Sequence, residues 1–452
     1  MDDRIGASLH RAAPPLGTVT LQPDLLIFPD GVREGLCVAI GPDGRLAGLI
    51  PAHEAAHAGI VVERLAGRAL LPGFVNAHSH VFQRRLRGRT HRGMAKRDSF
   101  WTWREAMYRE AHTLTPESLY RTAHTCYREM LEAGYTAVGE FHYLHHQPGG
   151  TPYDDPLALS RAVIAAAADA GIRLLLLPVA YNRAGFDRPA EPLQRRFCFP
   201  EVDAYLEHVD RLRAAIDDPR QAIGVALHSV RAVPEQWLGP IAAYAQRHAL
   251  PLHTHVAEQV GELEEVARHL GCTPIELLAR HTVLGPSTTL VHATHATEGD
   301  CALIGAAGAA VCVCPSTEGD LGDGIAPYAA FVEHGIRLAI GSDGQTRIDP
   351  LEELRWLEFS ARMRYQRRRI LATGLDSPAR ILLQAGTRNG ARSLAIHAGS
   401  FEPGGWADLV AVDLAHPSLV GADPDDLTDT LIFGAGAAVV REVWVAGRRV
   451  VS

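Results

Sequence analysis

The middle of the chain repeats one pattern of apolar and polar positions. A short, nearly uninterrupted apolar run is followed by turn residues and then by a longer stretch in which apolar positions recur three or four residues apart. Such runs indicate strands buried on both faces, and the wider spacing is typical of amphipathic helices. The runs predict strands within residues 73–80, 135–142, 172–180, 222–229, 251–257, 289–295, 309–315 and 337–343. Eight strands alternating with helices across residues 71–398 predict a (β/α)8 barrel, whose functional site lies at the carboxyl ends of the strands.

The stretch 114–134 shows how the helices between these strands are delimited. Thr115 has the side chain expected of an N-cap, Pro116 suits the first turn, and Gly134 suits the end of a helix. These signals predict a helix between the first two strands.

Both ends of the chain have a different pattern of apolar and polar residues. Residues 1–70 and 399–452 alternate short apolar runs with turn signals such as Pro-Asp-Gly, which is typical of antiparallel strands. We expect the two ends to pair into one small β-sandwich domain that flanks the barrel. The predicted division is therefore 1–70 and 399–452 for the β domain and 71–398 for the barrel.

Composition and charge narrow the range of partners. The net charge is -8 and no basic block is present, which argues against nucleic acid or an anionic membrane as partner. No basic and apolar leader is recognised, and no apolar run approaches the roughly 18 residues needed to span a bilayer. The 7 cysteines are scattered without a Cys-x-x-Cys pair, so neither a disulfide framework nor a thiolate zinc site is indicated. We expect a cytoplasmic protein that binds a small molecule.

Lysine is almost absent from the chain. Lys96 is the one lysine in the sequence, within a stretch that is predicted to be a loop. Chemistry that needs a buried lysine is therefore not expected, including a Schiff base, a P-loop and a carboxylated lysine bridging two metal ions.

Histidines and one aspartate end several of the predicted strands. His78 and His80 are two residues apart, so both side chains face the same side of the first strand. The fifth strand offers His255, which we favour over His253 because it lies closer to the carboxyl end, and the eighth strand ends at Asp343. Three imidazoles and one carboxylate suit Zn²⁺ with an open position for water, although iron or manganese also fits.

Other polar residues follow the same strand ends. The sixth strand presents His292, favoured over His295, and the fourth presents His228 and then Arg231. Glu258 follows His255 by three residues, where a carboxylate near a metal can carry protons between water and a leaving nitrogen. Each residue alone also fits a structural role, and it is their coincidence at one rim that favours a catalytic site.

Several strings resemble a known group of enzymes. The segments PGFVNAHSH, HTHVAEQ, LVHATHA and IGSD resemble the amidohydrolase superfamily in its mononuclear deaminase branch, with which the lack of a barrel lysine agrees. Across residues 70–360, longer strings such as HSHVFQRRLRG, RDSFWTWREAMYR and STEGDLGDGI resemble the N-formimino-L-glutamate deiminases. This resemblance implies hydrolysis of the formimino C=N bond of N-formimino-L-glutamate to N-formyl-L-glutamate and ammonia, a step of histidine degradation.

The resemblance also implies roles for individual residues. It assigns one Zn²⁺ per subunit to His78, His80, His255 and Asp343. It implies catalytic roles for Glu258, His292 and Asp343. Its substrate-binding positions fall on Gln83, Arg104, Tyr143, His228 and Arg231. We expect a homodimer, and the arginines suit a substrate with two carboxylates because guanidinium groups bind carboxylates through paired hydrogen bonds.

One position departs from the family pattern. A histidine commonly follows the strand-eight aspartate there, whereas this chain has Gln345, so the loop's part in substrate recognition or rate is open. The alternative function is deamination of a purine or pyrimidine ring with the same metal ligands. A catalytically silent barrel is a third interpretation, but such a chain is expected to have lost Glu258 or Asp343, and both are present.

Overall fold

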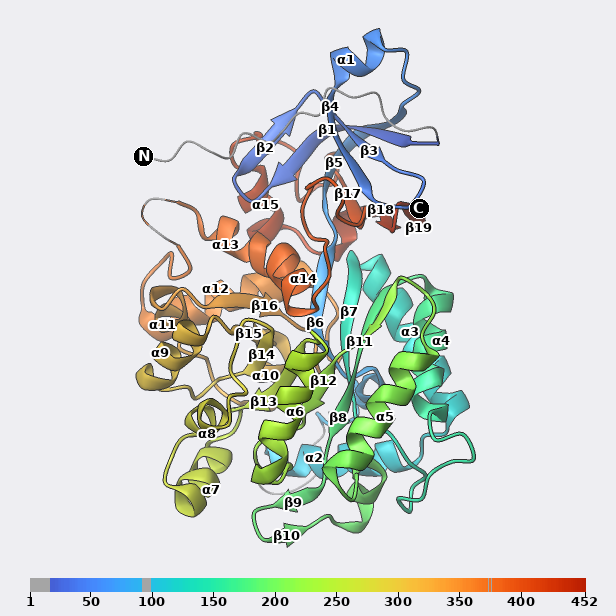
Figure 1. Ribbon diagram of the computed structural model, residues 1–452. Coiled ribbons are helices and arrows are strands. Elements are labelled where there is room, and N and C mark those ends of the chain that lie inside the picture. Colours follow the sequence, from blue (N-terminus) through green and yellow to red (C-terminus); the bar gives the residue numbers. More distant parts are fainter. Residues whose placement is uncertain (1–16, 92–98, 373, 375) are drawn as a thin grey trace.

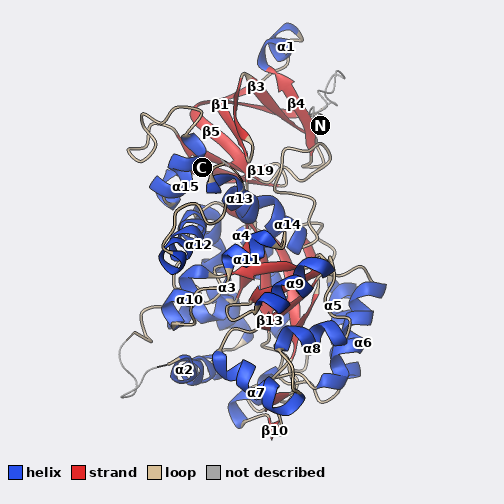
Figure 2. Cartoon of the chain, turned by 90° about the vertical axis from the view of Figure 1, so that its left-hand side faces the viewer, coloured by secondary structure: helices blue, strands red, loops and turns tan. Residues whose placement is uncertain are grey.

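The computed structural model describes residues 17–91, 99–372, 374 and 376–452, and Lys96 lies outside them. The chain forms a barrel of parallel strands and a second sheet built from both of its ends (Figure 1). Helices surround the barrel strands (Figure 2). This confirms the predicted (β/α)8 architecture with a terminal β unit.

The barrel contains a strand at each of the eight predicted positions. All neighbouring pairs are parallel, and a short extra strand, β11 (Gln221–Ile223), also pairs with β8. The eight strands are β6 (Phe74–Ser79), β7 (Tyr135–His142), β8 (Arg173–Ala180), β12 (Val225–Leu227), β13 (Leu252–Val256), β14 (Thr288–His292), β15 (Ala310–Val313) and β16 (Arg337–Ile340).

The first and last barrel strands meet at the site predicted from the sequence. Ser79 at the end of β6 forms a parallel bridge with Asp343, which follows β16. The backbone N–H of His80 donates to the carbonyl of Asp343 at 3.1 Å, and the N–H of Asp343 donates to the carbonyl of His78 at 3.0 Å. Backbone hydrogen bonds thus close the barrel and fix the His-Ser-His segment beside Asp343.

The helices follow the strands as the sequence predicts. In α3 (Pro116–Glu132), the hydroxyl of Thr115 accepts a hydrogen bond from the N–H of Ser118 at 3.2 Å, and Gly134 follows with a φ of +98°. Pro116 is the first residue of the helix, so all three helix signals are confirmed. The other helices after the barrel strands are α2 (Phe100–His112), α4 (Ala158–Ala170), α5 (Val202–Ala215), α6 (Glu235–Arg247), α7 (Val260–Leu270), α8 (Pro274–Arg280), α9 (Glu298–Ala307), α10 (Pro315–Leu321), α11 (Tyr328–Glu333), α12 (Pro350–Tyr365), α13 (Pro378–Gln384) and α14 (Gly390–Ser393).

The two ends of the chain pair in one sheet. Its order is β19-β18-β17-β5-β1-β3-β4, with β2 (Gly31–Glu34) beside β1. One face of it packs around Leu21, Leu70 and Trp444. The two ends therefore form one continuous sheet with its own core, where the sequence predicted a sandwich. The remaining strands are β1 (Val19–Phe28), β3 (Leu36–Ile40), β4 (Leu46–Pro51), β5 (Glu63–Pro72), β17 (Leu409–Asp413), β18 (Val440–Val445) and β19 (Arg448–Val451); helices α1 (Ala52–His57) and α15 (Leu427–Gly434) accompany them.

The terminal sheet covers the amino ends of the barrel strands. Arg173, the first residue of β8, contacts Asp408, which precedes β17. The carboxyl ends therefore face away from the sheet, at the lower end of the barrel in Figure 1. None of the helices in the described part of the chain is both long and apolar enough to cross a membrane.

Candidate active site

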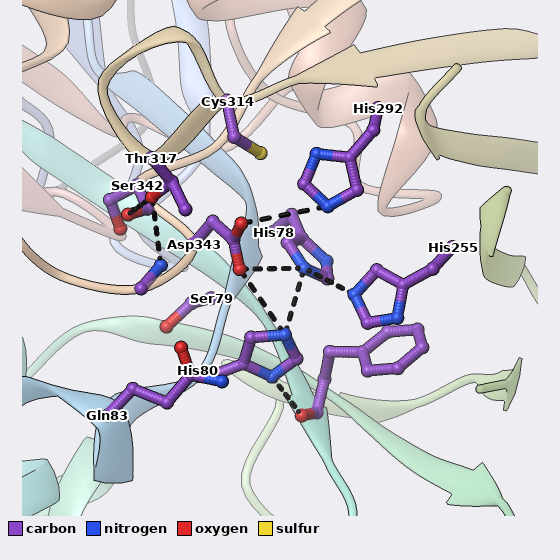
Figure 3. A network of polar contacts seen from close by, with 12 residues as sticks. His78, Ser79, His80, Gln83, His255, His292, Cys314, Thr317, Ser342 and Asp343 are labelled. Carbon is purple, nitrogen blue, oxygen red and sulfur yellow. Dashed lines mark hydrogen bonds and ion pairs between the residues drawn. The ribbon is translucent and has the colours of Figure 1, made fainter. Parts of the chain in front are cut away.

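Five side chains from four barrel strands converge at the carboxyl end of the barrel. His78 and His80 come from the end of β6, His255 from β13, His292 from β14, and Asp343 from the turn after β16 (Figure 3). Two overlapping groups have donor atoms within 4.8 Å of one another: His78 with His80 and His255, and His78 with His292 and Asp343. The structure therefore brings together all four ligand candidates from the sequence.

The distances from His78 to the three other donor atoms are close to those in a tetrahedral metal site. The Nε2 atom of His78 lies 3.1 Å from that of His80 and 3.1 Å from that of His255. One carboxylate oxygen of Asp343 lies 3.3 Å from Nε2 of both His78 and His80. Two ligand nitrogens bound to zinc at 2.0–2.1 Å are about 3.3 Å apart when the coordination is tetrahedral. The four donors therefore fit one divalent metal ion.

Backbone carbonyls set the imidazole tautomers. Nδ1 of His80 lies 2.8 Å from the carbonyl oxygen of Phe141, and Nδ1 of His255 lies 3.0 Å from that of His228. A carbonyl only accepts, so both Nδ1 atoms carry the hydrogen and both Nε2 atoms carry a lone pair. Both lone pairs face Nε2 of His78, which carries at most one hydrogen. Hydrogen bonding to His78 can therefore satisfy only one of them. Carbonyl-fixed imidazoles are typical of metal ligands.

The charge states also suit a metal. Burial lowers the pKa of His78 to about 3, and burial likewise lowers the pKa of His80 and of His255. Burial by itself raises the pKa of Asp343, but the hydrogen bond of His78 and the charge of His292 outweigh it and bring that pKa below its usual value. Neutral imidazoles and an ionised carboxylate are the forms that bind divalent cations.

The structure separates the favoured histidines from their neighbours. His253 is buried, and its Nε2 atom contacts the carbonyl oxygen of Ser393 at 2.8 Å, which is a packing role. His295 belongs to neither group of candidate metal donors among the described residues. His255 and His292, which the sequence analysis favours, both belong to the candidate donor groups.

His292 lies among three carboxylates. Its Nε2 atom is 3.9 Å from Glu258 and 3.7 Å from Asp343, and its Nδ1 atom is 3.3 Å from Glu318. Burial by itself lowers the pKa of His292, but the surrounding carboxylates, Glu258 first, outweigh burial and raise it well above its ordinary value. Burial raises the pKa of Glu258. The pair is therefore suited to exchange a proton.

One cavity joins the candidate metal ligands to the candidate substrate-binding residues. Its walls include His80, His255 and Asp343 on one side and Glu258 with His292 beside them. All five substrate-binding candidates also line it: Gln83, Arg104, Tyr143, His228 and Arg231. The structure thus gathers in one space residues that lie up to 263 positions apart in the sequence, from His80 to Asp343.

Two arginines give this cavity its positive charge. Arg104 on α2 lies over the ring of Trp101, with its guanidinium carbon 4.5 Å from the ring centroid, and its Nε and Nη1 atoms lack a hydrogen-bond partner in the described structure. Arg231 is buried, and its Nη1 atom donates to the carbonyl of Ala184 at 2.9 Å. Both guanidinium groups retain donors for a carboxylate.

Gln83 and Tyr143 form a pair on the wall beside His80. The side-chain amide nitrogen of Gln83 donates to the hydroxyl of Tyr143 at 3.0 Å. The amide oxygen of Gln83 is buried without a partner in the described structure. This oxygen is an acceptor that a bound N–H group can satisfy.

Sequence reasoning missed three buried acids. Glu318 hydrogen-bonds His292, Glu140 accepts from the hydroxyl of Ser79 at 2.6 Å, and Glu262 lines the cavity. Burial raises the pKa of Glu140 to about 8 and that of Glu262 to about 7. Glu262 stands one helical turn after Glu258, a spacing that was available as a signal, whereas the other two have no local pattern.

Gln345, the departure from the family pattern, is fully buried and lies outside the cavity wall. It bonds to residues of β6 and of the turn that holds Asp343. Its position therefore gives it no direct part in substrate recognition.

Comparison with known proteins agrees with this site. The model of the amidohydrolase family matches residues 69–450. Formimidoylglutamate deiminase of Pseudomonas aeruginosa is 42% identical over 428 residues, which cover 94% of this chain and 93% of the relative. The crystal structure of an amidohydrolase from Brucella melitensis is similar with a TM-score of 0.87 at 34% identity, covering 95% of this chain and 94% of that one. The crystal structure of an adenosine deaminase from Xanthomonas campestris with bound zinc has a TM-score of 0.78 at 25% identity, covering 95% and 92%. The chain therefore belongs to the amidohydrolase family.

Proposed function

We propose that this hydrolase converts N-formimino-L-glutamate and water to N-formyl-L-glutamate and ammonia, a step of L-histidine degradation. The observation that carries the proposal is that two arginines share one cavity with a three-histidine, one-aspartate donor set. An acidic, aliphatic amidine needs both features. The 42% identity to the Pseudomonas aeruginosa formimidoylglutamate deiminase over nearly the whole chain supports the same activity.

The proposed cofactor is one Zn²⁺ per subunit. His78, His80, His255 and Asp343 would hold it, and the chemistry that it supplies when bound is a water molecule acidic enough to react near neutral pH. Zinc bound to the similar adenosine deaminase supports this choice over iron or manganese. We further propose a cytoplasmic homodimer in which residues 71–398 form the catalytic unit and residues 1–70 and 399–452 the flanking one.

The substrate is proposed to bind through its two carboxylates. Arg104 and Arg231 would each pair with a carboxylate, because a guanidinium matches the geometry of that group. His228, Tyr143 and Gln83 complete the wall between these arginines and the candidate metal ligands. Binding at both ends would hold the formimino carbon beside His292 and Asp343.

The proposed reaction consists of addition and elimination at the formimino carbon. Asp343 accepts a proton from the attacking water as the water oxygen bonds to carbon and C=N becomes a single bond. His292 lies between Asp343 and Glu258, where it orients the water and stabilises the charge on oxygen. Glu258 delivers one proton to the nitrogen as C=N becomes a single bond. The proton held by Asp343 then passes to the same nitrogen and the hydroxyl proton of the intermediate returns to Glu258, so that C–N breaks, C=O forms and ammonia leaves.

An ammonia-release assay on the zinc-loaded protein tests this function. N-formimino-L-glutamate, N-formimino-L-aspartate and guanine are compared at equal concentration. We expect N-formimino-L-glutamate to be the best substrate and guanine to be inert. Ammonia from guanine alone would establish the alternative, a ring deaminase, and refute the proposal.

A further inference from the structure

Gln345 lies directly behind the candidate metal ligands. It is fully buried, and its backbone has a left-handed conformation with a φ of +61°, which a side chain other than glycine seldom adopts without compensating contacts. It stands two residues after Asp343, which also has a positive φ of 43°. The turn after β16 therefore holds both residues in conformations that need support from their surroundings.

Three hydrogen bonds of the Gln345 amide provide that support. Its nitrogen donates to the hydroxyl of Ser79 at 2.9 Å and to the carbonyl of Asp343 at 2.9 Å. Its oxygen accepts from the hydroxyl of Ser342 at 2.9 Å. Two donors and one acceptor are used on one side chain, and only an amide offers this combination at this length.

The contacts continue on both sides of Gln345. The hydroxyl of Ser79 donates a hydrogen bond to a carboxylate oxygen of Glu140 at 2.6 Å. The other oxygen of Glu140 accepts from the N–H of Val81 at 2.9 Å. The hydroxyl of Ser342 accepts from the amide nitrogen of Asn76 at 2.6 Å. Each donor in the series therefore has a separate acceptor, which fixes the orientation of the Gln345 amide.

This series joins the two strands that supply most of the ligands. Ser79 stands between His78 and His80, and its side chain lies on the opposite side of the strand from theirs (Figure 3). Ser342 directly precedes Asp343. Gln345 thus bridges the β6 and β16 ends at the point where backbone hydrogen bonds close the barrel.

We propose that Gln345 is a positioning residue of the metal centre, which holds the Asp343 carboxylate at a fixed place relative to His78 and His80 through Ser79 and Ser342. Without the amide, the Asp343 turn loses its side-chain tie to Ser79 and keeps its backbone bonds to β6 and the contact between Ser342 and Asn76. Residues that support metal ligands in this way commonly change metal affinity or activity by about 10- to 100-fold when replaced. The inference rests on the proposed metal site but not on the identity of the substrate.

The test is the rate at which zinc-loaded protein releases zinc to an excess of a coloured chelator. Gln345→Met keeps the length of the side chain and removes all three hydrogen bonds. We expect zinc release to be at least about tenfold faster than from the unmodified protein, because the supporting contacts of a ligand are lost. The kcat for N-formimino-L-glutamate should fall while KM changes little.

Gln221→Met is the matched control. Gln221 lies at the amino end of the barrel, on β11, and its amide nitrogen donates to the carbonyl of Ile164 at 3.0 Å. The Gln221→Met protein loses a partly buried hydrogen bond but should release zinc at the normal rate. Equal zinc release from Gln345→Met, Gln221→Met and the unmodified protein would overturn the proposal.

Ser79→Ala keeps the inference testable if Gln345→Met fails to fold. This substitution removes one hydroxyl and cuts the link from Gln345 to β6, so zinc release should again accelerate. Unchanged release from a folded Ser79→Ala protein would also overturn the proposal. Because zinc release needs no substrate, a failure of the ammonia assay leaves this test intact.

Discussion

Arg173 and Asp408 form a buried ion pair across the boundary between the barrel and the terminal sheet. Nε and Nη2 of Arg173 donate to the two carboxylate oxygens of Asp408 at 2.8 Å and 3.0 Å. The N–H of Ala446 donates to the same carboxylate at 2.7 Å, and the Arg173 guanidinium lies over the ring of Trp406. This pair joins the first residue of β8 to the segment before β17 and attaches the sheet to the barrel.

Breaking this pair should strongly destabilise the protein. Arg173→Met leaves the Asp408 carboxylate buried without its cation, and we expect a loss of about 3–5 kcal/mol in the free energy of unfolding. Urea unfolding of the metal-loaded protein measures it. The double variant Arg173→Met with Asp408→Leu should recover much of the loss, because no charge then remains buried. A double variant as unstable as the single one would contradict the role assigned to charge pairing.

Replacing a metal ligand should remove the ion, whereas replacing its neighbour should not. The unmodified protein should contain about one equivalent of divalent metal per chain, as four ligands imply. His255→Gln should abolish most of it. His253→Gln is the control, because His253 is a buried histidine of the same strand that bonds the carbonyl of Ser393. Elemental analysis after gel filtration measures the metal content of each variant. Metal retained in the His255→Gln protein would exclude His255 as a ligand.

Glu258→Gln should reduce turnover without loss of metal. The side chain lies 3.9 Å from Nε2 of His292 and its pKa is raised by burial, which suits proton transfer. General acid–base groups contribute about 10²- to 10⁴-fold, so kcat should fall within that range. Glu264→Gln, at an exposed position of the following helix, should have normal kcat. A Glu258→Gln protein with normal kcat would exclude Glu258 as the proton carrier.

Arg231→Met should weaken binding of the dicarboxylate. A hydrogen bond to a charged group contributes about 1.5–3 kcal/mol, so KM should rise by about 10- to 150-fold. Glutarate, a simple dicarboxylate, should inhibit the variant less strongly by a similar factor, and metal content should be unchanged. Normal KM and normal glutarate inhibition would show that Arg231 only supports the carbonyl of Ala184.

Glu353 should make stability depend on pH. It is fully buried, its carboxylate accepts hydrogen bonds from Ser316, and burial raises its pKa to about 8. A glutamate of the unfolded chain ionises near its model value of 4.5, so between these two values only the unfolded state has lost the proton. The contribution of Glu353 to stability is therefore complete below the lower value and is lost as the pH rises to the upper one.

Glu353→Gln removes this dependence. The free energy of unfolding of the variant, relative to the unmodified protein, should increase steadily from pH 5 to pH 8. Urea unfolding at several pH values, each with saturating zinc, measures the difference. A difference that stays constant over this range would mean that Glu353 is ionised in the folded protein.

Local sequence patterns were sufficient to predict the barrel strands and the positions of the candidate metal ligands on them. Apolar runs mark each barrel strand because a strand covered on both faces must be apolar throughout, and the two-residue spacing of His78 and His80 places both on one face. Turn and cap residues delimit α3 for equally local reasons. Once a barrel is inferred, the rule that strand ends meet at one rim brings His255 and Asp343 to the same place.

Only the tertiary structure decided which side chains surround and support the candidate site residues. Glu318 reaches His292 across 26 residues, Glu140 reaches Ser79 across 61, and Gln345 reaches Ser79 across 266. Such contacts leave no periodic signal, because each depends on the orientation of one side chain in a space that exists only after the barrel closes. The sequence by itself therefore determined the fold and a set of candidate metal ligands. The folded chain alone decided how the ligands are held, because hydrogen bonds between distant strands depend on distance in space and not on spacing along the chain.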